Sequence, residues 1–94
     1  MKGLLASLPL LAACAALDPP ETELATAKKA LDDAAPLAMA YAAPEWSQAR
    51  SKLERARESY EKRDWRRSRG LAEEAELDAR YAQALAEGER AREP

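Results

Sequence analysis

Alanine recurs along this chain at alternating spacings of three and four residues. The longest run is Ala72, Ala75, Ala79, Ala82 and Ala86, and these residues share one face of an α-helix because the helix has 3.6 residues per turn. Valine, isoleucine and phenylalanine are absent, so the chain lacks most of the β-branched and aromatic residues that favour strands. The sequence therefore predicts an all-α fold.

Two further apolar stripes precede this run. The first lies within residues 20–42, where Pro36 is expected to kink the helix because proline lacks a backbone N–H. The second begins after Pro44, and the third after Asp64, which is predicted to cap its helix. The three stripes consist of Leu24, Ala27, Leu31, Ala34, Ala38 and Tyr41; of Trp46, Ala49, Leu53, Ala56 and Tyr60; and of Trp65, Ser68, Ala72, Ala75, Ala79, Ala82 and Ala86.

The ends of these helices follow from residues that begin or break helices. Asp18 is predicted to cap the first helix, with Pro19 at its first position. The charged segment 88–94, which contains Gly88, is expected to fray. Helices joined by turns of a few residues lie antiparallel, so residues 20–87 are predicted to form an up-down-up three-helix bundle.

The N-terminal residues have the form of a secretory signal. Lys2 is followed by an apolar run that is shorter than the ~20 residues of a transmembrane helix. The run ends in Leu11-Ala12-Ala13-Cys14, which resembles the lipobox of bacterial lipoproteins. This resemblance implies that residues 1–13 are a signal peptide cut before Cys14, and that residues 14–19 are a tether with diacylglycerol and an N-acyl lipid on Cys14.

The residue after the cysteine is Ala15 rather than aspartate. In enterobacteria-type sorting, the resemblance then implies an anchor in the outer membrane that faces the periplasm. The alternative is that Cys14 is an ordinary small residue of a signal cut elsewhere.

Composition argues against several classes of function. The formal net charge is −2 and histidine is absent, which is not the balance of a nucleic-acid-binding protein. The sequence contains no glycine-rich phosphate loop, and Glu73, Glu74 and Glu76 are expected to form a solvated face rather than a metal site. We expect no enzymatic activity, no metal or other cofactor besides the lipid, and no small-molecule substrate.

A basic cluster surrounds the predicted turn between the second and third helices. Arg66 and Arg67 fall in the first turn of the third helix, where the helix dipole disfavours cations. Because the second helix returns over the length of the first, this turn is expected near the lipid surface. The candidate contacts to a membrane or a partner are Lys62, Arg63, Trp65, Arg66, Arg67 and Arg69. The alternative is that Trp65 closes the apolar stripe and that the arginines are solvated or paired with Glu61 and Asp64.

A second candidate surface lies on the third helix. Leu77, Tyr81 and Ala84 fall roughly opposite its alanine stripe. They are interpreted either as a contact surface for another protein, or as residues that touch a neighbouring helix or are simply exposed.

The helical part also resembles a known family. The segments Ala42-Ala43-Pro44-Glu45 and Asp64-Trp65, and the alanine spacings around them, are similar to small bacterial lipoproteins with an alanine-rich helical domain of unknown function. Such domains are often encoded near, or fused to, OmpA-like domains, and the resemblance covers about residues 21–86. The hairpin of the second and third helices resembles a tetratricopeptide unit, without that family's Leu-Gly pair or internal repeats.

These observations lead to one main functional expectation and two alternatives. The main expectation is a non-catalytic envelope lipoprotein that acts as an adaptor or structural element, with a protein partner or a second copy of itself. One alternative is a module that binds anionic lipid through the basic turn. The other is an accessory subunit of an envelope enzyme that docks through Leu77 and Tyr81.

Overall fold

A computed structural model describes residues 18–94, and these residues form three helices. Helix α2 spans Glu21–Tyr41, α3 spans Ala43–Glu61 and α4 spans Trp65–Ala91. The described residues contain no strand, so the predicted all-α class is confirmed. Cys14 and the lipobox residues Leu11, Ala12 and Ala13 lie outside the described residues.

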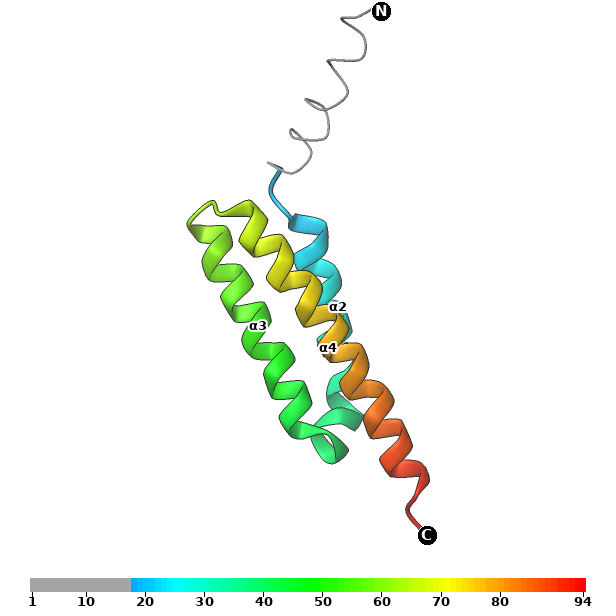
Figure 1. Ribbon diagram of the computed structural model, residues 1–94. Coiled ribbons are helices and arrows are strands. Elements are labelled where there is room, and N and C mark those ends of the chain that lie inside the picture. Colours follow the sequence, from blue (N-terminus) through cyan, green and yellow to red (C-terminus); the bar gives the residue numbers. More distant parts are fainter. Residues whose placement is uncertain (1–17) are drawn as a thin grey trace, which may run out of the picture.

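The helices run up, down and up, and all three pack against one another (Figure 1). The α3–α4 turn lies at the same end as the start of α2, whereas the α2–α3 junction lies toward the opposite end, where the C-terminus is also found. Helix α4 packs extensively on both α2 and α3, and α2 touches α3 much less. The longest helix therefore holds the other two together.

Alanine dominates the core. One group of buried residues joins all three helices and contains Ala27, Leu31, Ala49, Leu53, Ala56, Leu71, Ala72, Ala75 and Ala79. A second group, toward the C-terminal end, contains Ala34, Ala38, Ala42, Ala82 and Ala86. Small side chains at these positions let the helix backbones approach closely.

Two side chains reinforce the contacts between the helices. Trp46 packs against both groups of the core, and its indole N–H donates a hydrogen bond to the Leu31 carbonyl at 3.0 Å. The fully buried Ser68 donates from its hydroxyl to the Ala56 carbonyl at 2.8 Å. Both bonds satisfy polar groups that would be costly to bury unpaired.

The structure confirms the predicted cap of the third helix, and it corrects the predicted cap of the first helix and the predicted end of the third. Asp64 caps α4 by accepting a hydrogen bond from the Arg67 N–H at 3.2 Å. Asp18 does not cap α2: the N-cap is Pro20, which has no side-chain acceptor. Helix α4 does not stop before Gly88 but continues to Ala91, because Ala86 is anchored in the core and Tyr41 donates to the Glu93 carboxylate at 2.8 Å.

Pro36 is accommodated inside α2, which is assigned as one helix on both sides of it. Its ring is exposed, so the missing backbone hydrogen bond lies on the solvent side. None of the three described helices is both long enough and apolar enough to cross a membrane.

Candidate functional site: the basic end of the bundle

The α3–α4 turn forms the tip of the basic end. The Arg63 N–H donates to the Tyr60 carbonyl at 2.9 Å, and the Asp64 N–H donates to the Ser59 carbonyl at 2.9 Å. This pair of bonds defines a Schellman motif, which requires a left-handed residue after the helix. Arg63 occupies that position with φ of 60°, where glycine is the usual residue.

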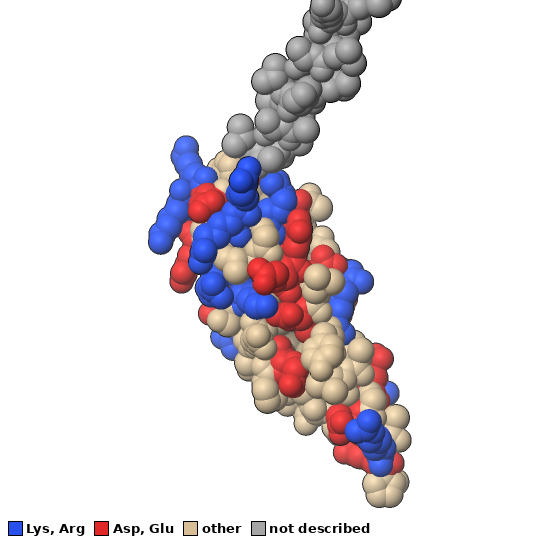
Figure 2. Space-filling model, viewed as in Figure 1, with Lys and Arg blue, Asp and Glu red and all other residues tan. Residues whose placement is uncertain are grey.

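Four cations at this turn have no ion-pair partner within residues 18–94: Lys62, Arg63, Arg66 and Arg67. Arg66 and Arg67 lie in the first turn of α4, which contains no acidic residue. The carboxylate of Asp64 is engaged by its capping bond to the Arg67 N–H. The alternative in which these arginines pair with Glu61 or Asp64 is therefore not the arrangement observed. Figure 2 shows Lys and Arg gathered at this end of the molecule.

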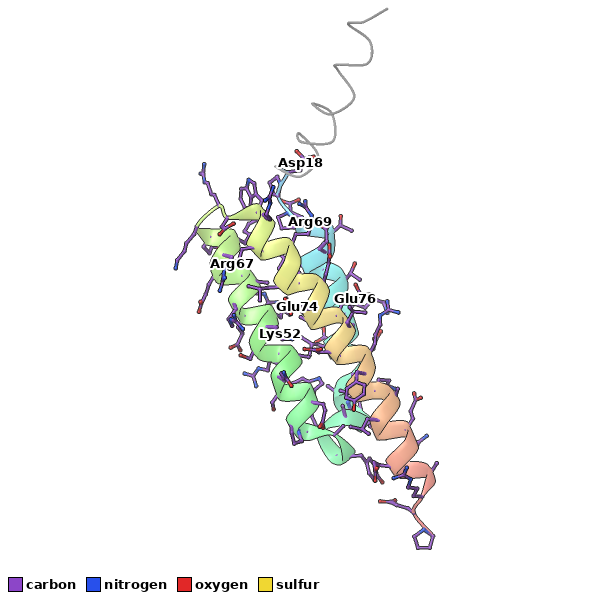
Figure 3. The ribbon with its side chains drawn as sticks, in the orientation of Figure 1. Asp18, Lys52, Arg67, Arg69, Glu74 and Glu76 are labelled. Carbon is purple, nitrogen blue, oxygen red and sulfur yellow. The ribbon has the colours of Figure 1, made fainter. Side chains whose placement is uncertain are left out.

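Arg69 has a different role from its neighbours. Its Nε lies 3.1 Å from a carboxylate oxygen of Glu23, and its Nη2 donates to the Asp18 carbonyl at 2.9 Å (Figure 3). The guanidinium therefore ties the start of α2 to α4. Its charge is paired with that of Glu23, which distinguishes Arg69 from the four unpaired cations of the turn.

Trp65 belongs to the same connection. Its ring is half-buried and lies 4.9 Å from the Tyr60 ring, measured between centroids. The Tyr60 hydroxyl donates to the Glu21 carboxylate at 3.0 Å, and this hydrogen bond raises the pKa of Tyr60. Together with Arg69, these contacts fix the point where the chain enters α2 beside the basic turn.

A pocket that was not predicted from the sequence opens on the α3 side of the turn. It has a volume of about 410 Å³ and is lined by Arg55, Glu58, Ser59, Lys62, Asp64 and Arg67. Arg55, Ser59 and Lys62 are spaced four and three residues apart, so they share one face of α3. That spacing was a visible signal, but only the fold brings Arg67 to it.

The carboxylates at 73, 74 and 76 do not converge. Glu74 lies 3.5 Å and Asp78 2.7 Å from the Lys52 ammonium (Figure 3), and Glu76 pairs with Arg80 at 2.7 Å. Within residues 18–94, no group of three or more His, Cys, Asp or Glu side chains is arranged to hold a metal ion.

The second predicted surface is exposed. Leu77 and Tyr81 keep 65% and 61% of their surface open to solvent, and Ala84 is also exposed. These residues therefore do not touch a neighbouring helix to the extent that would bury them.

The basic end thus combines unpaired cations, a strained arginine at the tip, and the entry of the chain into α2. Comparisons of the chain with models of known protein families, with curated proteins and with solved structures find no match.

Proposed function

We propose that this protein is a non-catalytic envelope lipoprotein, anchored by lipid on Cys14, whose helical domain stands on the membrane surface with its basic end against anionic headgroups. The observation that supports this most directly is the position of Asp18. The Asp18 carbonyl accepts a hydrogen bond from Arg69. Arg69 lies four positions after Trp65, the first residue of α4. An anchor four residues upstream of Asp18 would hold the unpaired cations close to the lipid.

The charges suit a membrane surface better than a buried protein interface. A basic residue near an anionic bilayer contributes about 1 kcal/mol, so four unpaired cations would add several kcal/mol to an acyl anchor. A lipid chain combined with a basic patch is a known route to stable attachment. The same charges would be costly to bury at an apolar interface without partners.

The proposed compartment follows from the N-terminal residues and not from the helices. The lipobox and Ala15 support attachment to the outer membrane, facing the periplasm. In this position the far end of the bundle, with the α2–α3 junction and the C-terminus, would point into the periplasm (Figure 1).

The two tryptophans provide a test of this orientation. Trp65 lies at the basic turn, and Trp46 lies near the start of α3 at the opposite end. The full chain would be reconstituted into anionic vesicles as two single-tryptophan variants, Trp46→Phe and Trp65→Phe. Lipids with a quencher at the headgroup should quench Trp65 strongly and Trp46 weakly, and salt should reduce the difference.

Circular dichroism would first establish that both variants keep the helical content of the wild type. Equal quenching of the two tryptophans, or stronger quenching of Trp46, would contradict the orientation. Loss of membrane attachment in Cys14→Ala would support the lipid anchor, and unchanged processing and attachment would contradict it.

A second function, as an adaptor for an envelope protein, is favoured by the exposed Leu77 and Tyr81. On a domain held upright by its basic end, this face of α4 would be accessible from the periplasm. Crosslinking in cells would compare the wild type with Leu77→Ser and Tyr81→Ser. A protein partner lost in both variants supports the adaptor function, and an unchanged crosslinking pattern argues against this face.

A further inference from the structure

The pocket beside the basic turn has the composition of an anion site. Three of its lining residues, Arg55, Lys62 and Arg67, are cationic, and none of them has an ion-pair partner within residues 18–94. Two of the three carry guanidinium groups, whose planar donors match the oxygens of a phosphate. They come from two helices, so the pocket is formed by the fold and not by one helical surface.

Ser59 contributes a hydroxyl to the pocket. Only 6% of the residue's surface is exposed, and among the described residues its hydroxyl has no hydrogen-bond partner. The Ser59 oxygen is not one of the fully buried polar atoms that lack a partner, so it is open to the pocket and to water. The other buried serine differs, since Ser68 donates to the Ala56 carbonyl. An acceptor bound in the pocket would therefore find the Ser59 hydroxyl available.

Two acids also line the pocket and define what it can hold. Asp64 caps α4 by accepting a hydrogen bond from the Arg67 N–H, and its carboxylate keeps a negative charge that opposes an anion. Glu58 has no ion-pair partner among the described residues and would repel an anion. With three cations against two acids, the site retains a net positive charge. Glu58 is therefore predicted to lower the affinity for an anion without preventing its binding.

We infer that the pocket formed by Arg55, Ser59, Lys62 and Arg67 binds a phosphate group, either on a lipid headgroup or as a free phosphate. This inference rests on the proposed function where the phosphate is that of a lipid, because the pocket opens at the end of the molecule proposed to face the bilayer. It adds to that function a specific binding site, distinct from the diffuse attraction of the exposed arginines.

The first experiment measures binding of inorganic phosphate to the full chain in a neutral detergent, at constant ionic strength. The variants are Arg67→Gln and Ser59→Ala in the pocket. The matched control is Arg66→Gln, which removes the same charge from the adjacent position but does not line the pocket. Thermal unfolding would establish that all variants are folded.

Loss of a charge-assisted hydrogen bond predicts about a tenfold weaker affinity for Arg67→Gln, and loss of a neutral one about fivefold for Ser59→Ala. Arg66→Gln should stay within about twofold, because the charge it removes is exposed and screened. Glu58→Gln should bind phosphate more tightly. Absence of saturable binding by the wild type, or an equal loss in Arg66→Gln and Arg67→Gln, would overturn the inference.

A second experiment separates the two sources of phosphate and the two proposals. Vesicles containing a phosphomonoester lipid would be compared with vesicles of a phosphodiester lipid. A preference for the phosphomonoester that disappears in Ser59→Ala supports a headgroup in the pocket. Phosphate binding without quenching of Trp65 on either vesicle supports a free-phosphate site and contradicts the membrane orientation. Quenching of Trp65 without any effect of Ser59→Ala retains the orientation and contradicts the pocket.

Discussion

A single arginine shows a conflict between stability and charge at the tip of the bundle. Arg63 adopts the left-handed conformation that the Schellman motif requires, although a side chain there costs about 1–2 kcal/mol. Glycine would adopt it without strain. Strained residues of this kind gather at functional sites, and Arg63 carries one of the exposed, unpaired positive charges of the turn.

Replacement of Arg63 by glycine should therefore separate the two effects. We expect Arg63→Gly to raise the free energy of unfolding by about 1 kcal/mol, and to weaken association with anionic vesicles because one unpaired charge is lost. Urea denaturation and vesicle co-sedimentation would measure the two quantities. Arg66→Gln is the control: it should also weaken vesicle binding, and its gain in stability should be smaller, because it relieves only an unfavourable charge near the start of α4 and no backbone strain. A less stable Arg63→Gly would contradict this account.

At the level of the helices, periodicity predicted most of the core, although it missed Leu71 and Ala42. The alanine stripes of α2, α3 and α4 are buried as the spacing predicted, and Asp64 caps α4 as expected. The ends of α2 and α4 were not predictable in this way. Whether Asp18 caps a helix depends on where its backbone is held, and Arg69 holds it through a contact between residues 51 positions apart. The stability of the last turns of α4 likewise depends on Tyr41.

Gly70 gives a prediction that concerns α4 alone. It is exposed within the helix, and a methyl group added at this position would meet no atom within 4 Å. Gly70→Ala should therefore stabilise the protein by about 0.5–1 kcal/mol, because alanine has the higher helix propensity. Thermal unfolding followed by circular dichroism would measure the gain. Gly88→Ala, near the end of the same helix, should give a smaller gain because terminal turns fray.

For the molecule as a whole, the sequence predicted the bundle and the location of its basic turn. It did not predict which of the basic residues form ion pairs and which stay unpaired. Arg69 and Arg67 are close in sequence, yet one is paired with Glu23 and the other is unpaired and lines the pocket. Arg55 and Ser59 were missed because they become part of a site only when α4 packs beside them. Such assignments require tertiary distances that no local pattern contains.

The contacts that join the helices also predict how stability depends on pH. Hydrogen bonding to Asp78 raises the pKa of Lys52, and hydrogen bonds to Glu93 and Glu21 raise the pKa of Tyr41 and Tyr60. A group that binds its proton more tightly when folded stabilises the fold below its ordinary pKa. That contribution is lost as the pH rises through the raised value.

The contribution of these three groups to the free energy of unfolding should therefore be constant below about pH 10, the ordinary pKa of tyrosine. It should decrease above that pH. Urea midpoints between pH 8 and 12 would measure the decrease. Tyr60→Phe should flatten part of this dependence, because one of the contributing protons is absent. A midpoint that rises with pH in this range would show that the assigned sign is wrong.

The packing of the bundle can be tested with two substitutions on one helix. Ala79 is fully buried, whereas Ala84 is exposed on the same helix. Leucine at position 79 would force the helices apart, and we expect Ala79→Leu to lower the free energy of unfolding by about 1–3 kcal/mol or more. Ala84→Leu should change it by less than about 0.5 kcal/mol. Equal effects would show that the alanine core tolerates larger side chains.

An interior built from alanine also limits how this protein can change over generations. In a core of large side chains, a substitution can enlarge or shrink a residue, and a neighbour can compensate for either. Most positions of the present core already hold nearly the smallest side chain, and only glycine is smaller, at a cost to the helix. At these alanine positions almost every single replacement is an enlargement, and only a few large neighbours, such as Leu31, Leu53 and Leu71, could shrink to compensate. Most tolerated substitutions are thus expected on the outer faces of the helices. These faces include the charges of the basic end and the exposed face of α4.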